Sequence, residues 1–141
     1  MCHNDFMDTM KLQTVRLLDA DVVIDIQRGH PAAGTWYASA SSGSLALLGH
    51  VLMEVYQSAQ NQQQTLAVDR LTRSLPLVWP TDAESLKAVA NFRRLHLSSG
   101  LGLIDALIAA AALSLGVPLC TFNVKHFRHV PGLVTEQPYL R

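Results

Sequence analysis

The fold is indicated first by residues 15–26, which read VRLLDADVVIDI. The opening of this run is short and densely apolar, as is typical of a strand buried on both faces of a parallel sheet. It predicts a strand at about 15–19, so that Asp19 stands where the strand ends. The β-branched residues 22–24 either extend this strand or open a helix, and the pattern leaves both possibilities open.

Outward from this run, short apolar segments alternate with segments of helical periodicity. The predicted strands are 45–48, an edge strand fenced by prolines within 75–80, and 117–122; the predicted helices begin near 51, run from 81 or 82 to about 96, and span 103–113 with an end at Gly116. Residues 39–44, 57–64, 98–100 and 123–127 are interpreted as turns, loops or helix ends. The alternation predicts a three-layer α/β/α sandwich with a mainly parallel central sheet.

Length and composition favour one globular domain. The chain has 141 residues, of which 49% are hydrophobic and 16% charged. We expect residues 1–13 to form a flexible N-terminal extension and 14–141 to form the domain. Eleven basic residues balance eleven acidic ones, so any contact with nucleic acid must come from a local patch.

The chain carries no pattern typical of export or of a membrane. Cys2 and Cys120 belong to no disulfide framework, which favours a reducing compartment. The first twenty residues lack a signal-peptide core, and no uninterrupted apolar run is long enough to span a bilayer. We therefore expect a soluble, cytoplasmic protein that makes no contact with a membrane.

Three carboxylates are embedded in apolar sequence, namely Asp19, Glu54 and Asp105. Burying an unpaired carboxylate is costly. The ends of parallel strands and the starts of the following helices meet along one edge of the sheet, so all three can face one crevice. Converging acids call for a counter-charge, which Mg²⁺ or Mn²⁺ supplies together with water that can attack a phosphodiester. The alternative for Glu54 and Asp105 is the capping of a helix start, and Asp21 is interpreted as a supporting group.

Four segments in order resemble PIN-domain proteins of the VapC toxin type. They are LLDADVVID at 17–25, ME at 53–54, IDALIAA at 104–110 and LCTFNVKHF at 119–127, within a resemblance that spans about residues 15–139. The resemblance implies a PIN-like sandwich, a magnesium-dependent endoribonuclease that cleaves RNA, and a toxin with a cognate antitoxin protein whose tail covers the crevice. It also implies a homodimer.

Carried over residue by residue, the catalytic acids of that family fall on Asp19, Glu54 and Asp105, which would also hold the metal. The fourth acidic position falls on Asn123, which is neutral but still offers an oxygen to a metal-bound water. This departure lowers the charge of the site and puts a second metal in doubt. Thr121 matches a small hydroxyl residue that would orient Asp19 or a water, or is a strand residue with a satisfied hydroxyl.

Arg28, Lys125 and Arg128 lie near the predicted site loops and are candidates for binding RNA phosphates, with solvated surface as the alternative. His126 and His129 lack the further ligand pair that a zinc site needs.

Two other functions are compatible with the same residues. The Asp19-Ala20-Asp21 segment resembles the start of haloacid-dehalogenase-type phosphatases, with Asp19 as nucleophile, although the usual following pattern and a late acidic pair are missing. The other function is a PIN-like module that has lost catalysis through Asn123 and only binds RNA or a protein.

Overall fold

The central sheet has five strands in the order β3-β2-β1-β4-β5, and every pairing among them is parallel. The computed structural model describes residues 15–141, so the predicted extension at 1–13 lies outside the described residues. The strands are β1 (Arg16–Leu18), β2 (Leu45–Leu48), β3 (Leu77–Val78), β4 (Leu119–Cys120) and β5 (Thr135–Glu136). The prediction of a mainly parallel sheet is confirmed, with β1 in its centre and β3 at one edge.

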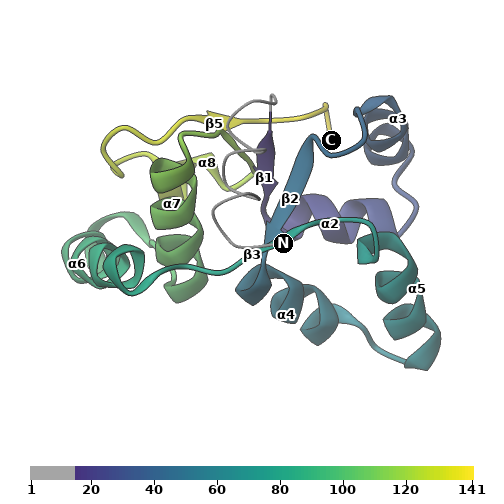
Figure 1. Cartoon of the computed structure of the whole chain (residues 1–141), viewed down its shortest axis with the longest axis horizontal. Helices are drawn as coiled ribbons and strands as arrows, with labels where there is room; N and C mark the ends of the chain where they lie inside the picture. The colour runs from purple at the N-terminus through teal and green to yellow at the C-terminus, as the bar shows by residue number, and fades with distance from the viewer. Residues whose placement is uncertain (1–14) are drawn as a thin grey trace.

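Helices cover both faces of the sheet, as predicted for a three-layer sandwich. Figure 1 shows α6 and α7 on one side of the strands and α2, α3, α4 and α5 on the other. The helices are α2 (Ala20–Gln27), α3 (Pro31–Ser39), α4 (Gly49–Ser58), α5 (Gln62–Thr72), α6 (Asp82–Ser99), α7 (Leu103–Leu115) and α8 (Val124–Phe127). None of the helices within residues 15–141 is long and apolar enough to cross a membrane.

The core follows from the apolar runs that the sequence places in the strands and in α7. Leu17 and Leu18 of β1 are fully buried, as are Leu47 and Leu48 of β2. Helix α7 buries a row of alanines against α6, and such small side chains let two helices approach closely. Strand β1 is thus packed in the middle of the sheet, and its position fixes that of Asp19, which follows it.

Helix ends agree with the predicted capping signals. Thr81 Oγ1 accepts a hydrogen bond from the Glu84 N–H, and the Glu84 carboxylate accepts one from the Thr81 N–H, which forms a capping box at the start of α6. Gly116 ends α7 with φ at 69°, in the left-handed region that favours glycine.

Several local predictions are corrected. Residues 22–24 belong to α2 and do not extend β1, because Asp19 caps a helix immediately after the strand. Helix α4 begins at Gly49 and not at Val51, Ser98 and Ser99 are helical, and α8 replaces most of the predicted loop at 123–127. Helices α3 and α5 and strand β5 were not expected from the pattern.

Gly49→Ala is expected to lower the free energy of unfolding by about 1 kcal/mol, at the low end of overpacking effects, because the 52% exposed Trp79 side chain can shift aside. A Cβ at this position would collide with the Trp79 indole, which packs over the start of α4. Gly34→Ala is the matched control, because it lies within α3 and its Cβ would meet no atom within 4 Å. Alanine there should raise stability slightly through helix propensity. Urea unfolding of both variants checks the prediction, which equal effects would contradict.

Candidate active site

The acidic residues gather where the strand order changes direction. From β1 the chain continues to β2 and β3 on one side, whereas β4 and β5 lie on the other. In open parallel sheets, ligands bind in the crevice at the carboxyl ends of the strands at such a point. Asp19 directly follows β1, and Thr121 directly follows the neighbouring strand β4.

Asp19 is a buried carboxylate, with 5% of its surface exposed. Its Oδ1 accepts a hydrogen bond from the Ala20 N–H at 2.8 Å, and its Oδ2 accepts one from the Thr121 hydroxyl at 2.7 Å. Burial, followed by repulsion from Asp21 and a smaller repulsion from Asp105, raises the pKa of Asp19 to about 7, although both hydrogen bonds oppose the rise. Ionisation of the Asp19 carboxyl is therefore less favourable in the folded chain than in water.

Asp21 holds the loop after β4 against the start of α2. Its Oδ2 accepts a hydrogen bond from the Phe122 N–H at 2.8 Å, and its Oδ1 accepts one from the Val22 N–H. Burial raises the pKa of Asp21 despite these two bonds. Asp21 thus joins the start of α2 to the loop after β4, next to Asp19 in the chain.

Asp105 lies in the first turn of α7 and has one oxygen engaged. Its Oδ2 accepts a hydrogen bond from the Gly102 N–H at 2.9 Å, so the capping role considered for this residue is present. The His126 Nδ1 lies 3.6 Å from the same oxygen. Among the described residues, the Asp105 Oδ1 has no hydrogen-bond partner. Repulsion from Asp105 makes a small contribution to the raised pKa of Asp19, so the two carboxylates are coupled.

Glu54 lies in the second turn of α4, so the expectation that it sits at the helix start is wrong. It is half-buried, and α4 packs against both α2 and α7. Burial, then repulsion from Asp105 and from Asp21, raises the pKa of Glu54. Glu54 is therefore coupled electrostatically to Asp105 and Asp21, and a role in helix capping does not account for it.

The remaining candidates divide into two groups. Asn123 is exposed, its N–H donates to the Thr121 Oγ1 at 3.0 Å, and it precedes α8, which carries Lys125 and is followed by Arg128. These residues follow β4 in the chain, and the end of β4 lies beside Asp19. Arg28 caps the far end of α2, whereas Asp19 caps its beginning, about 12 Å away along an eight-residue helix. The structure does not bring Arg28 to the acidic site.

A hard divalent cation fits the chemistry of these residues. Lys and Arg side chains form no ion pair with Asp19, Asp21 or Glu54 anywhere in residues 15–141. The same residues contain no group of three His, Cys, Asp or Glu placed as a ready-made metal site. Mg²⁺ is commonly bound through one or two carboxylates and completes its shell with water and substrate phosphate. Asp19 and Asp105 meet that smaller requirement.

Two features of this region were not predicted from the sequence. His126 lies beside Asp105, and Asp25 binds the distant residues Tyr139 and Arg141. No local pattern connects residue 25 with residue 141.

Thr121→Val is expected to lower the catalytic rate by roughly 10–100-fold. An effect of this size is typical when a residue that hydrogen-bonds to a metal-binding side chain is removed, and Thr121 is such a partner of Asp19, a candidate metal ligand. The change keeps the shape of the fully buried side chain but leaves the Asp19 Oδ2 and the Asn123 N–H without their partner. Thr121→Ser retains the hydroxyl and should stay within a few-fold of the wild type. Steady-state rates of both variants test this; equal rates would show that the hydroxyl has no role in catalysis.

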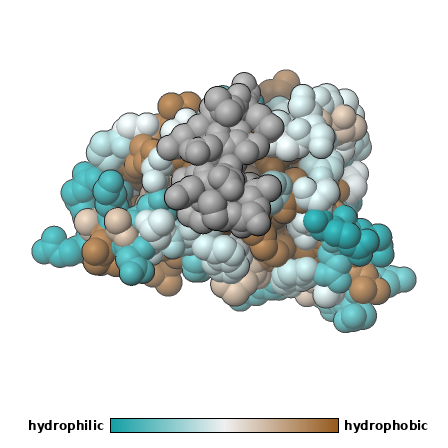
Figure 2. Space-filling model, in the orientation of Figure 1, coloured by the Kyte–Doolittle hydropathy of each residue, from teal (hydrophilic) through white to brown (hydrophobic). Residues whose placement is uncertain are grey.

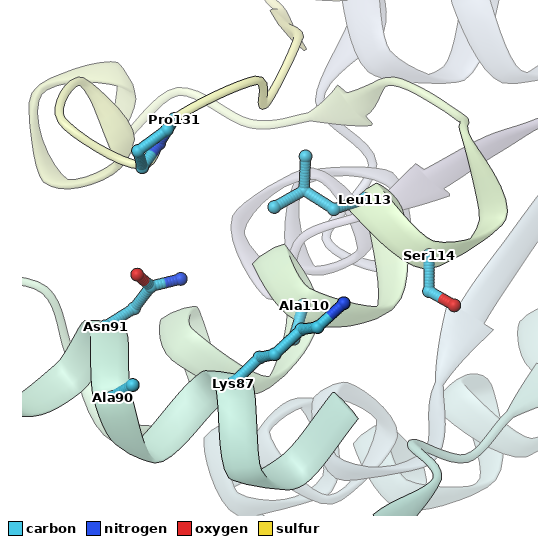
Figure 3. Close-up of a pocket in the computed structure, with 7 residues that line it drawn as sticks. All are labelled: Lys87, Ala90, Asn91, Ala110, Leu113, Ser114 and Pro131. Carbon is cyan, nitrogen blue, oxygen red and sulfur yellow. The ribbon is translucent and has the colours of Figure 1, made fainter. Parts of the chain in front are cut away.

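A separate hollow lies between α6, α7 and the loop that follows α8. It encloses about 320 Å³, and Figure 3 shows Lys87 and Asn91 of α6 facing Leu113 and Ser114 of α7, with Pro131 beyond them. None of the acidic candidates lines this hollow. It is therefore distinct from the acidic site.

Comparisons with known proteins agree on one family. The chain is 29% identical over 128 residues to a Mycobacterium tuberculosis protein named Ribonuclease VapC19, an alignment that covers 89% of this chain and all of the relative. A toxin-antitoxin complex from Klebsiella pneumoniae contains a chain with 25% identity and a TM-score of 0.71, covering 89% of this chain and 99% of that one. The DNA-bound VapBC from Salmonella typhimurium gives a TM-score of 0.73 at 19% identity, covering 88% and 98%.

The family model described as PIN domain matches residues 16–133, which include β1, all the acids of the crevice and the loop after β4. Together with the parallel sheet and the acids at its switch point, this match is decisive: the chain belongs to the PIN-domain family.

Proposed function

We propose that this protein is a metal-dependent endoribonuclease and the toxin of a toxin-antitoxin pair. The observation that carries the proposal is the buried Asp19 carboxylate at the centre of the sheet, which is surrounded by further acids and has no basic partner among the described residues. The relative named as a ribonuclease supports the activity. A phosphatase is less well supported, since the family model that matches is that of the PIN domain.

In this proposal Asp19 and Asp105 hold Mg²⁺, with Mn²⁺ as a substitute, and Glu54 adds negative charge beside them. When bound, the ion supplies a Lewis acid for a phosphodiester oxygen and lowers the pKa of a bound water. Thr121 fixes the orientation of Asp19 through its hydrogen bond. Asn123 offers an amide group to the attacking water or to a phosphate oxygen. Lys125 and Arg128 bind phosphates of the RNA backbone.

The direct test incubates purified protein with a structured RNA in Mg²⁺, in Mn²⁺ and in EDTA, and maps the new RNA ends by sequencing. We expect cleavage with either ion and none in EDTA. RNA that is bound but remains uncut under all conditions would favour the binding-only module. A trapped aspartyl-phosphate on Asp19 would favour the phosphatase.

We also propose an antitoxin protein and a second copy of this chain as partners. The similar solved structures named above are toxin-antitoxin complexes, one of them bound to DNA. Helices α6 and α7 expose Leu86, Val89 and Leu103, and hydrophobic residues lie among hydrophilic ones at the end of the molecule that α6 forms (Figure 2). Light scattering on the isolated protein should give twice 15.4 kDa for a homodimer.

A further inference from the structure

The last described residues fold back onto α2 and are fixed there by one carboxylate. In Figure 1 the yellow end of the chain runs past β5 towards the side on which α2 and α3 lie. The Tyr139 hydroxyl donates to the Asp25 Oδ2 at 2.8 Å, and the Arg141 Nε donates to the same oxygen at 3.0 Å. The Arg141 Nη2 donates to the Asp25 Oδ1 at 3.1 Å. Asp25 therefore binds the Arg141 guanidinium through both of its carboxylate oxygens.

The Arg141 guanidinium is also stacked on a residue of the acidic site. Its central carbon lies 4.6 Å from the centroid of the Phe122 ring, and the Tyr139 ring lies 4.9 Å from the same centroid. Phe122 stands between Thr121 and Asn123, and its N–H donates to Asp21. The stack thus places a positive charge beside the loop after β4, whose Phe122 N–H binds Asp21.

The Arg141 guanidinium is coupled electrostatically to Asp21, one of the acids of the site. Arg141 lowers the pKa of Asp21, against the larger effect of burial, and Asp21 in turn contributes to a raised pKa for Arg141. Arg141 is bound to Asp25 rather than to Asp21, so it neighbours the site without filling it. This position, next to the acidic site but outside it, is suited to a side chain that contacts a substrate beside the reacting group.

Part of the guanidinium remains available for a ligand. An arginine has five N–H donors in a planar fork, and the pair with Asp25 uses two of them. The Arg141 side chain is 48% exposed. A guanidinium that is stacked on a ring and oriented by a carboxylate has lost much of its rotamer freedom, which favours binding of a phosphate through the remaining donors.

We propose that Arg141 is a substrate-binding residue that holds a backbone phosphate of RNA beside the acidic site, with Asp25 and Tyr139 as its positioning residues. This inference rests on the proposed ribonuclease function. It adds a third phosphate contact to those proposed for Lys125 and Arg128, from a residue that no motif in the sequence indicates. The competing role is purely structural, in which the pair only fastens residues 139–141 to α2.

The experiment measures binding and cleavage separately. A fluorescently labelled 20-nucleotide RNA of mixed sequence is titrated with the full chain in EDTA at several salt concentrations, and kcat and KM are measured on the same RNA with Mg²⁺. Arg141→Ala is compared with Arg141→Lys, Tyr139→Phe and Asp25→Asn. Arg73→Ala, at the end of α5, removes the same charge from an exposed position and serves as the matched control.

We expect Arg141→Ala to weaken RNA binding roughly 5–10-fold and to reduce the salt dependence by about 0.7 in log–log slope, the value for one lost phosphate contact on a single strand. KM should rise while kcat stays within about twofold. Arg141→Lys should restore part of the affinity, and Asp25→Asn should weaken binding less than Arg141→Ala. Arg73→Ala should match the wild type.

An Arg141→Ala variant with a lower Tm but unchanged RNA affinity and salt slope would overturn the inference and leave the structural role. If that result came with normal cleavage, the proposed ribonuclease function would stand. If Arg141→Ala lost affinity while the wild type bound RNA but failed to cut it, the phosphate contact would stand and the ribonuclease function would fall.

Discussion

Asp19→Asn is expected to lower the rate of RNA cleavage by roughly 100-fold or more, since Lewis-acid stabilisation of a transition state is worth several kcal/mol and each 1.36 kcal/mol is a factor of ten. The substitution is nearly isosteric. An asparagine oxygen can still accept the hydrogen bond from the Ala20 N–H, and the new amide can donate to the Thr121 hydroxyl. The fold should therefore persist while the central anionic ligand is lost.

Asp82→Asn is the matched control, because it removes one carboxylate from the exposed first turn of α6. Its cleavage rate should equal that of the wild type in single-turnover assays with Mg²⁺. Asp105→Asn should resemble Asp19→Asn, with an added loss of stability because Asp105 also binds the Gly102 N–H. Cleavage by Asp19→Asn at the wild-type rate would place the active site elsewhere.

The central strands β1 and β2 could be predicted from the sequence, whereas the edge strand β5 could not. Residues 15–19 and 45–48 are buried on both faces, and burial imposes a dense apolar pattern that is visible without any tertiary information. The convergence of Asp19 and Asp105 then follows from parallel topology alone. In contrast, β5 is two residues long and is held by backbone bonds such as that from the Thr121 N–H to the Glu136 carbonyl, which leave no trace in side-chain pattern.

Errors in the predicted site arise from helix boundaries and from distant pairs. The N-cap residue of α4 is Leu48, whose side chain makes no capping hydrogen bond, so the sequence contains no signal for the start of this helix. Glu54 was therefore predicted in the first turn of the helix, whereas it lies in the second. The sequence pattern did not decide between strand and helix for residues 22–24, so Arg28 was predicted to lie near the site. In the structure these residues belong to α2, which places Arg28 at the opposite end of the helix from Asp19. The pair of Asp25 with Arg141 joins residues 116 positions apart, and only the folded chain brings them together.

In the absence of divalent ions, we expect the stability of the protein to fall as the pH rises from about 4 to 7 and to level off above that range. Asp19 has a pKa of about 7 in the folded chain, against an ordinary value near 4. The folded state therefore binds a proton more tightly than the unfolded state does. The stability that this proton contributes is fully present below about pH 4 and is lost as the pH rises through 7. Three units of pKa correspond to an effect on the order of 4 kcal/mol.

Asp19→Asn isolates this contribution from the other titrating groups. Glu54 and Asp21 also have raised pKa values and act in the same direction, whereas the pKa of Asp25 is lowered because the hydrogen bonds from Arg141 and Tyr139 outweigh its burial. Urea unfolding in EDTA at pH 5 and pH 8 should show a much smaller decline for the variant than for the wild type. Parallel declines in the two proteins would mean that Asp19 is not the buried acid that titrates.

The same measurement with Mg²⁺ connects stability to function. A cation that binds only the folded state stabilises it in proportion to the logarithm of its concentration relative to Kd. Because binding requires the ionised carboxylate, Mg²⁺ should restore stability to the wild type at pH 8 and have little effect at pH 5. Asp19→Asn should respond weakly at both values. Under the proposed function, the charge that destabilises the free protein is the charge that binds the ion.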